Sequence, residues 1–578
     1  MRWLRFVVVS LALIPAGACV PPSAPASDAA AARGPTSVDD GASKTLVLAQ
    51  LNAPKLIGVW EFGTTAGGIA SLGEVHSTGL VTLDGQGNPI PRLAGGIPSF
   101  DEGSIVFLPD GRMQTTWRLR SDVSWQDGAL FTAEDVVFTQ AVHATPELRA
   151  SLRHTPPFIE RIDAPDPLTA VITWKSTYYN ALYLDHRSFW LMPKHLLAEA
   201  LESDKDAFLG LPYFTTNYVH LGPFRLFDWG QGQDMVFERY DGYVLGRPKV
   251  GKIIIRVIPD PNTMFASLKA GAIDVITEKS IPTNLSIQLQ QEWRRSGEGV
   301  VLSRQENWNY AWLQFDPQYA RPLELSQDVR IRRGLLFGFD RDALREFMLP
   351  GQPDTSADTF MTANDSRAAI AGQPFARYPF DPARAQQELA DAGWRRAADG
   401  RVLDLAGTPV QFELRAGAAY GSALPIIAAD WRRLGLEVTE YITPPQLGSD
   451  PEQQASFPAL DVRARSAGEG IFPSFDSRES ATAQNRFRGG NYSHYANPAL
   501  DRLIDKLYGT LDPRERGLIV RDMGELMASE LFALPVYWGI SFLHVRRTLR
   551  GNLEEDFPHT SDTSGGAVAR NAHLWERV

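Results

Sequence analysis

The 578-residue sequence has almost no cysteine: its single thiol is Cys19, close to the N-terminus. A chain with one cysteine cannot form an internal disulfide, and it lacks the cysteine pairs of structural zinc sites. Only ten histidines are present, and none stands four positions before another. The sequence therefore predicts neither a disulfide scaffold nor a metal centre, and we expect no cofactor.

The short motifs that mark common reaction centres are also missing. The sequence contains no G-x-S-x-G elbow, H-E-x-x-H zinc helix, G-x-x-x-x-G-K-[ST] phosphate loop or calcium-loop spacing. The stretch GQGQDM after Trp229 has two glycines of a dinucleotide-binding loop and lacks the third. We predict that the protein is not an enzyme, although a triad assembled from distant residues would leave no such motif.

The sequence also has fewer positive than negative charges, and it has no long apolar run. Lys and Arg number 57 against 68 Asp and Glu, which leaves a formal net charge of −11. An acidic chain is a poor general partner for nucleic acid or an anionic membrane surface. No apolar run reaches the roughly 20 residues that a membrane-spanning helix needs.

What the sequence does contain around Cys19 is an export signal. Two arginines precede a short apolar run over 6–14, and small residues follow it. A cysteine directly after small residues resembles the lipobox of bacterial lipoproteins, except that the usual leucine three positions earlier is Ala16. The resemblance implies a signal peptide over 1–18 and lipid attachment at Cys19. The alternative is an ordinary secretory signal that happens to end near a cysteine.

Residues 19–44 are predicted to be a disordered tether. The segment is rich in proline and small residues, so it cannot bury enough apolar surface to offset its ordering entropy. A flexible chain of this length spans about 25–30 Å. The body would then stand off the membrane in the cell envelope, in the periplasm or on the outer face of the cytoplasmic membrane, held by its lipid alone.

The remaining chain has the pattern of an α/β protein. Residues 253–276 and 410–442 each show a strand, a helix and a second strand, with Gly271 and Gly435 at the helix ends. Strands joined by helical crossovers form parallel sheets covered on both faces. Residues 104–120 instead predict an antiparallel hairpin.

The segment WRLRSDVSWQDGALFTAEDVVFT, at 117–139, closely resembles the signature of family 5 extracellular solute-binding proteins. These include the oligopeptide- and dipeptide-binding components of ABC importers. Six further segments match the family in its own order: HSTGLVTLDGQGNPIPRLA, LGPFRLFDW, LKAGAIDV, DVRIRRGLLFGFDRDAL, YPFDPARAQQELADAGW and YANPALDRLI. The resemblance covers nearly the whole chain after the tether.

The family resemblance implies a two-lobed, periplasmic-binding-protein type II-like fold with an inserted subdomain and a hinge between the lobes. Closure of the lobes on a ligand would be a hinge motion. The expected division is 1–18 signal peptide, 19–44 tether, 45–85 first part of lobe I, 86–218 inserted subdomain, 219–306 second part of lobe I, 307–535 lobe II and 536–578 C-terminal return to lobe I.

The sequence departs from the peptide-binding members at one place. Those members carry a W-x-x-D-Y-x-D-P run whose carboxylate holds the peptide α-ammonium group, and residues 457–492 lack it. The segment offers Arg463 and Arg465 instead, which a strand would place on one face, and Glu469 as the nearest acid. Guanidinium groups suit carboxylate or phosphate ligands. The alternative is that these arginines lie on a solvated face.

Aromatic side chains are the other candidate ligand contacts. Trp308 and Tyr310 alternate on the expected crossover strand, and ligand pockets are commonly lined with such rings. Asn491, Tyr492 and Tyr495 lie where the family closes its cleft. The alternative is that these rings are core, because an aromatic stripe at a period of two more often belongs to a buried core.

Two functions are consistent with these features. The first is the substrate-binding lipoprotein of an ABC importer, a monomer that delivers a peptide or a related oligomer-sized organic solute to the membrane permease. The second is a solute-binding fold that has lost its pocket and regulates an envelope or cell-wall process. The identity and charge of the ligand are not predicted.

Overall fold

The computed structural model describes residues 45–58, 69–85, 87–148, 158–230, 233–352, 357–358, 360–361, 370, 376–444, 446–448, 450–466, 469–557 and 567–578. The predicted signal peptide, the tether and Cys19 lie outside these residues. All described residues belong to a single unit that spans Gly41–Val578.

Among the described residues, the largest sheet has ten strands in the order β16-β15-β17-β12-β18-β11-β1-β10-β9-β8. Its strands are β1 (Thr45–Gln50), β8 (Phe224–Trp229), β9 (Met235–Arg239), β10 (Lys252–Val257), β11 (Val275–Ile276), β12 (Gly299–Leu313), β15 (Gln411–Gly417), β16 (Glu437–Thr443), β17 (Leu460–Ser466) and β18 (Ala533–Arg546).

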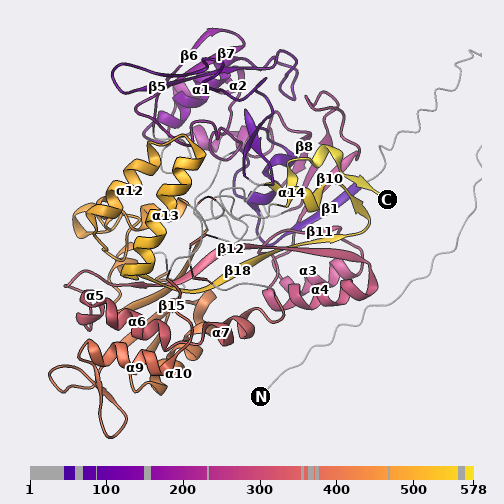
Figure 1. Ribbon diagram of the computed structural model, residues 1–578. Coiled ribbons are helices and arrows are strands. Elements are labelled where there is room, and N and C mark those ends of the chain that lie inside the picture. The colour runs from indigo at the N-terminus through magenta and orange to yellow at the C-terminus, as the bar shows by residue number, and fades with distance from the viewer. Residues whose placement is uncertain are drawn as a thin grey trace, which may run out of the picture. The chain divides into compact units, whose positions relative to one another are not determined.

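The two longest strands of this sheet lie between its two halves, and we call β12 and β18 the crossing strands. They pair antiparallel from Gly299↔Arg546 to Trp312↔Ala533, and Figure 1 shows them side by side. The register shifts between Gln305 and Asn307, which is a β-bulge at Glu306. β17 pairs with β12 only from Asn307 onward, so the described part of β12 before the bulge has a strand neighbour on one side only.

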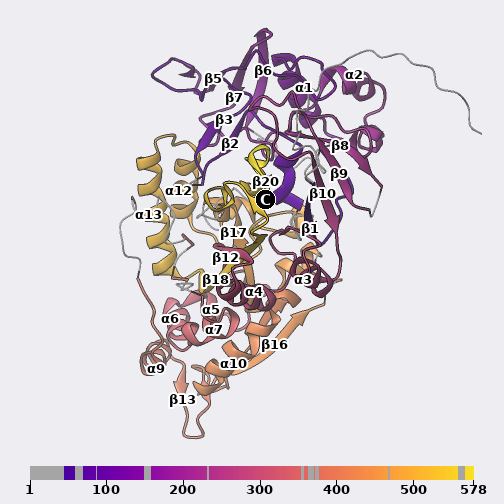
Figure 2. The ribbon, with the colours of Figure 1, turned by 90° about the vertical axis from the view of Figure 1, so that its right-hand side faces the viewer.

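Both predicted strand–helix–strand units are confirmed. β10, α3 (Pro261–Lys269) and β11 form the first, in which both strands run parallel to β1 between them. β15, α10 (Leu424–Arg433) and β16 form the second, with adjacent parallel strands and α10 beside β16 (Figure 2). Gly271 and Gly435 have φ of 76° and 98°, which explains the glycine after each helix.

The predicted hairpin belongs to a second sheet of four strands, in the order β4-β5-β7-β6. These are β4 (Ile105–Phe107), β5 (Met113–Arg118), β6 (Ile159–Asp166) and β7 (Thr169–Trp174), and α1 (Ala133–Ala144) accompanies them. The sheet has its own hydrophobic core, which includes Trp117, Trp125 and Trp174. The sheet lies inside the predicted subdomain 86–218. The boundaries of that subdomain stay a prediction.

The remaining described strands are the short pairs β2 (Val81–Leu83) with β3 (Pro89–Pro91), β13 (Arg395–Arg396) with β14 (Val402–Leu403) and β19 (Leu549–Arg550) with β20 (Glu576–Arg577). The other described α-helices are α2 (Lys194–Ser203), α4 (Thr283–Ser296), α5 (Glu324–Gln327), α6 (Val329–Phe337), α7 (Arg341–Met348), α9 (Pro382–Asp391), α11 (Pro451–Ala455), α12 (Pro498–Tyr508), α13 (Pro513–Glu530) and α14 (Leu553–Asp556).

Side-chain caps begin several helices, and the Asp512-Pro513 pair marks one of these starts in the sequence. Asp512 accepts a hydrogen bond from the Glu515 amide at 2.7 Å, and Pro513 occupies the first helical position of α13.

We expect Asp512→Ala to lower the free energy of unfolding by about 1 kcal/mol, because the amide loses its acceptor. Urea denaturation measures the change, and Asp512→Asn is the control that keeps the cap. Equal losses in the two variants would contradict this role.

Candidate functional site

Three aromatic side chains lie along one face of β12, as their spacing predicts. The ring centroids of Trp308 and Tyr310 are 4.4 Å apart, and those of Tyr310 and Trp312 are 5.7 Å apart. All three side chains are fully buried, in a core that also contains Phe475 and residues of α12 and α13. The stripe therefore serves as packing, and a ligand would meet it only at the edge of this core.

The two arginines of β17 lie on the same face of the sheet. Arg465 stands opposite Trp308 and Arg463 stands opposite Tyr310 in the antiparallel register, so the side chains of each pair are neighbours. Both guanidinium groups lie over the Trp312 ring, 5.0 and 5.1 Å from its centroid. The structure thus joins the predicted arginines and aromatics into one cluster.

The guanidinium of Arg463 already has partners inside the protein. Its guanidinium forms an ion pair with Asp461 at 2.6 Å and donates to the Gln454 backbone oxygen at 2.9 Å. It also lies 5.3 Å from the centroid of the Tyr492 ring. These contacts hold Arg463 in place and leave its charge largely neutralised.

Arg465 differs from Arg463 in its partners. Its guanidinium donates one hydrogen bond, to the Ala464 carbonyl at 3.3 Å, and it pairs with no carboxylate among the described side chains. The side chain is partly exposed. Arg465 is therefore a cation that an anionic ligand could approach.

The hydroxyl of Tyr420 lies near several charged side chains, and Arg465 is one of them. Burial raises the pKa of the Tyr420 hydroxyl, whereas the nearby cations Lys279 and Arg465 lower this pKa and Glu306 raises it. These four residues come from the segment after β11, the bulge of β12, the 3₁₀-helix Ala418–Ala423 and β17. Groups from both sides of the crossing strands therefore meet here.

The bulge of β12 holds a group of charges that we call the crossing-strand network. Glu306 pairs with Lys279 at 2.9 Å and accepts a hydrogen bond from the Ser541 hydroxyl of β18. Arg304 pairs with Glu278 at 2.6 Å, and their side chains are only 2% and 5% exposed. Burial disfavours the charged form of Glu306, but Lys279, Arg304 and Ser541 together keep its pKa below the usual value.

The remaining predicted site residues lie beside the aromatic core. Asn491 is fully buried and donates to the Asp476 and Tyr495 carbonyls at 3.1 and 2.8 Å. Tyr495 stacks on Phe532 with centroids 4.3 Å apart, and burial raises the pKa of its hydroxyl to about 12. Both residues thus have intramolecular partners. Their predicted ligand contacts stay predictions.

Tyr492 and Glu469 complete the set. The ring of Tyr492 lies edge-on to Trp312, 5.8 Å between centroids, and is partly buried. Glu469 begins the 3₁₀-helix Glu469–Ser474, and its side chain lies outside the described part of the structure. Tyr492 is therefore a partly exposed predicted contact that lies beside Arg463 and Trp312.

The crossing-strand network was missed by the sequence analysis. A signal for it exists, because Arg304 and Glu306 are the only charged residues of the long strand at 299–313. A buried strand position rarely carries a charge without a partner. The partners Glu278 and Lys279 follow β11, and only the tertiary structure brings them close.

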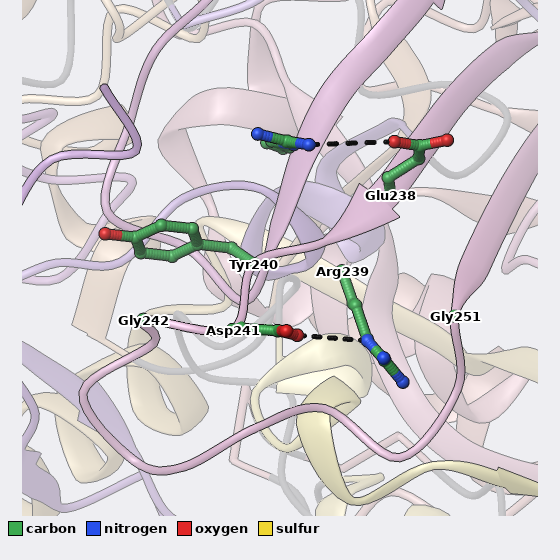
Figure 3. A pocket seen from close by; sticks show the side chains of 7 residues that line it. Glu238, Arg239, Tyr240, Asp241, Gly242 and Gly251 are labelled. Atoms are coloured by element: carbon green, nitrogen blue, oxygen red, sulfur yellow. Dashed lines mark ion pairs between the residues drawn. The ribbon is translucent and has the colours of Figure 1, made fainter. Parts of the chain in front are cut away.

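A separate pocket of about 450 Å³ lies at the end of β9 (Figure 3). Arg225 faces Glu238 at 3.8 Å and Arg239 faces Asp241 at 3.0 Å, so the arginines of the pocket are paired with carboxylates of the pocket.

Within the described residues, no group of three or more His, Cys, Asp or Glu could hold a metal ion, and no helix is long and apolar enough to cross a membrane.

Comparison with known proteins agrees with this architecture. The model of the family described as bacterial extracellular solute-binding proteins, family 5 Middle, matches residues 104–462. The oligopeptide-binding protein AppA of Bacillus subtilis (strain 168) is 23% identical over 402 residues, which cover 68% of this chain and 70% of AppA.

Two solved structures show the fold. AppA from Bacillus subtilis in complex with a nonapeptide gives a TM-score of 0.66 at 18% identity, covering 93% of this chain and 99% of AppA. NikA from Brucella suis in complex with Fe(III)-EDTA gives a TM-score of 0.72 at 20% identity, covering 93% of this chain and 100% of NikA. The predicted two-lobed, periplasmic-binding-protein type II-like α/β fold is thereby confirmed. The family match spans more than half of the chain, which therefore belongs to family 5 of the bacterial extracellular solute-binding proteins.

Proposed function

We propose that this protein is the substrate-binding lipoprotein of an ABC importer. It captures a peptide or a related oligomer-sized organic solute between its lobes and delivers this solute to the permease subunits in the membrane. It acts as a monomer, catalyses no reaction and is held to the membrane by a lipid on Cys19. The family match over residues 104–462 is the observation that carries the proposal.

The ligand that this site favours is anionic or neutral. The run that holds a peptide α-ammonium group in related proteins is missing, and Arg465 stands in the cluster without a described carboxylate partner. Arg465 would bind a carboxylate or phosphate group through paired hydrogen bonds. Tyr492, which is partly exposed, would contact the apolar part of the ligand.

The release and capture of ligand follow from a shift between open and closed populations. A ligand that contacts both lobes only when they are closed stabilises the closed form, which the permease then recognises. The crossing strands would carry the bending at the Glu306 bulge, since it interrupts their regular pairing. Micromolar affinity, about 8 kcal/mol, is sufficient for such capture.

Native mass spectrometry of the full chain in mild detergent, followed by denaturation, tests this function. We expect one peptide or organic anion to leave each protein molecule. An empty protein whose melting temperature does not respond to peptide or metabolite libraries would contradict ligand capture.

Substitution of Arg465 tests the ligand chemistry separately. We expect Arg465→Ala to weaken binding of the co-purified ligand about tenfold or more, because a hydrogen bond to a charged group contributes about 1.5–3 kcal/mol. Isothermal titration calorimetry measures the dissociation constant. Arg488→Ala is the matched control, since Arg488 is an exposed arginine of the same segment. Unchanged binding in Arg465→Ala would contradict the assigned role.

A second candidate function is a regulatory envelope or cell-wall lipoprotein that transports no ligand. The observation that favours it is the complete burial of Trp308 and Tyr310, together with the internal hydrogen bonds of Asn491. A protein of this kind would act through its surface. Release of no ligand in the mass-spectrometry experiment would favour this function over the first.

A further inference from the structure

A cavity of about 650 Å³ lies away from the arginine and aromatic cluster, where the crossing strands reach the β11 side of the large sheet. Its walls come from the last turns of α4, the first residues of β12, the end of β18, and the segment from β19 to α14. Its size is in the range of small-molecule sites, about 300–1,000 Å³. The cavity can therefore hold an organic ligand.

The cavity is strongly basic, although the chain as a whole is acidic. Four arginines line it and Glu554 is the one acid in its described lining. The guanidinium of Arg546 is used internally, because it donates to the Leu268 carbonyl at 2.8 Å at the end of α3. The other three arginines, Arg294, Arg547 and Arg550, are exposed and form no side-chain hydrogen bond or ion pair with a described residue.

Stabilisation of a helix end explains the position of only one of these three arginines. Arg294 stands in the last turn of α4, where a positive charge offsets the negative end of the helix dipole. Arg547 and Arg550 come from the other end of the chain and follow β18. The pocket of Figure 3 shows the contrasting case, in which each lining arginine faces a carboxylate.

The arginines stand beside an apolar wall. Trp293, Val545 and Leu549 are buried residues of the lining, and the Trp293 ring packs where Gly299 has no side chain. The adjoining part of β12 has a strand neighbour on one side only, and the cavity lies where α4 meets the two crossing strands. A ligand that fits this lining has an anionic group and an apolar part.

We infer that this cavity is a second binding site, for an amphipathic anion whose phosphate or carboxylate lies among Arg294, Arg547 and Arg550. The apolar part of the anion packs on Trp293 and Leu549. Guanidinium groups bind such anions through paired, charge-assisted hydrogen bonds. An anionic phospholipid and a free alkyl phosphate both present this chemistry. The site is independent of the proposed ligand between the lobes.

Native mass spectrometry of the full chain in neutral detergent tests the site with three probes: dipalmitoyl phosphatidylglycerol, dipalmitoyl phosphatidylcholine and octyl phosphate. We expect one bound phosphatidylglycerol or octyl phosphate, and at least tenfold weaker binding of phosphatidylcholine. Tighter binding of phosphatidylglycerol identifies a membrane lipid as the source, and tighter binding of octyl phosphate identifies a free anion.

Paired variants assign the binding to this cavity. Arg294→Gln and Arg550→Gln are each expected to weaken binding of the preferred probe about tenfold, through loss of one charge-assisted contact. Arg295→Gln is the matched control, because Arg295 is the exposed neighbour of Arg294 and does not line the cavity. Equal weakening by Arg294→Gln and Arg295→Gln would overturn the inference, as would equally tight binding of the two phospholipids or no binding of either anionic probe. Release of the lobe ligand in the same spectra reports on the proposed function separately.

Discussion

Replacement of Arg304 by methionine is expected to lower the free energy of unfolding by about 3–5 kcal/mol, the cost of breaking a buried ion pair. The guanidinium pairs with Glu278 at 2.6 Å, and both side chains are almost completely buried. Methionine keeps the length and apolar character of the side chain. Glu278 then stays inside the protein without this cation, which is the source of the loss.

Urea denaturation measures this change, and an exposed pair supplies the control. Arg401 and Asp399 are 2.7 Å apart with 54% and 49% of their side chains exposed. Arg401→Met should therefore cost at most about 1 kcal/mol. Equal losses for Arg304→Met and Arg401→Met would show that burial adds nothing to the Arg304 pair.

The same variant should change how stability depends on pH. The pKa of Glu306 is lowered in the folded protein, in part by Arg304. A lowered carboxyl pKa contributes stability above the unfolded pKa, and this contribution is lost as the pH falls through the folded pKa. Arg304→Met removes one of the cations, so the stability difference from the unmodified protein should shrink at acidic pH.

Replacement of Trp312 by alanine is the second change with a large expected effect. The side chain is fully buried between Tyr310, Phe475 and Tyr492, and loss of such a ring costs about 3–5 kcal/mol. Trp312 also lies under both guanidinium groups of β17. The variant should therefore lose ligand affinity as well as stability, because Arg465 is no longer held in position.

A second buried tryptophan separates these two effects. Trp394 is 2% exposed in the core beside β15 and β17, so Trp394→Ala should cost a similar amount of stability. Urea denaturation and calorimetry with the co-purified ligand give the two readouts. Ligand affinity should fall only in Trp312→Ala. Equal affinity in both variants would mean that Trp312 supports the fold and not the site.

The elements that the sequence predicted correctly are those decided by short-range patterns. Alternation along 410–414 and helical spacing over 427–434 identified the unit of β15, α10 and β16. Asp512 followed by Pro513 marked the start of α13. Such features depend on the backbone conformation of a few neighbouring residues, so the local sequence is sufficient to indicate them.

The candidate site was only partly predictable for the same reason. Spacing placed Arg463 and Arg465 on one face of a strand and Trp308 and Tyr310 on one face of another. Spacing does not say which strands become neighbours, since pairing depends on burial across the whole chain. The antiparallel register between β12 and β17 is what sets Arg465 opposite Trp308.

Taken alone, the sequence determined the α/β class, the family and the faces of the individual strands. The tertiary structure decided that Lys279 meets Glu306 at the crossing strands and that Arg294 meets Arg547 and Arg550 around one cavity. These residues are far apart in the chain, and no periodicity connects them. Charges from distant segments become neighbours only when the sheet is assembled, because its long-range pairings bring the ends of separate strands and helices together.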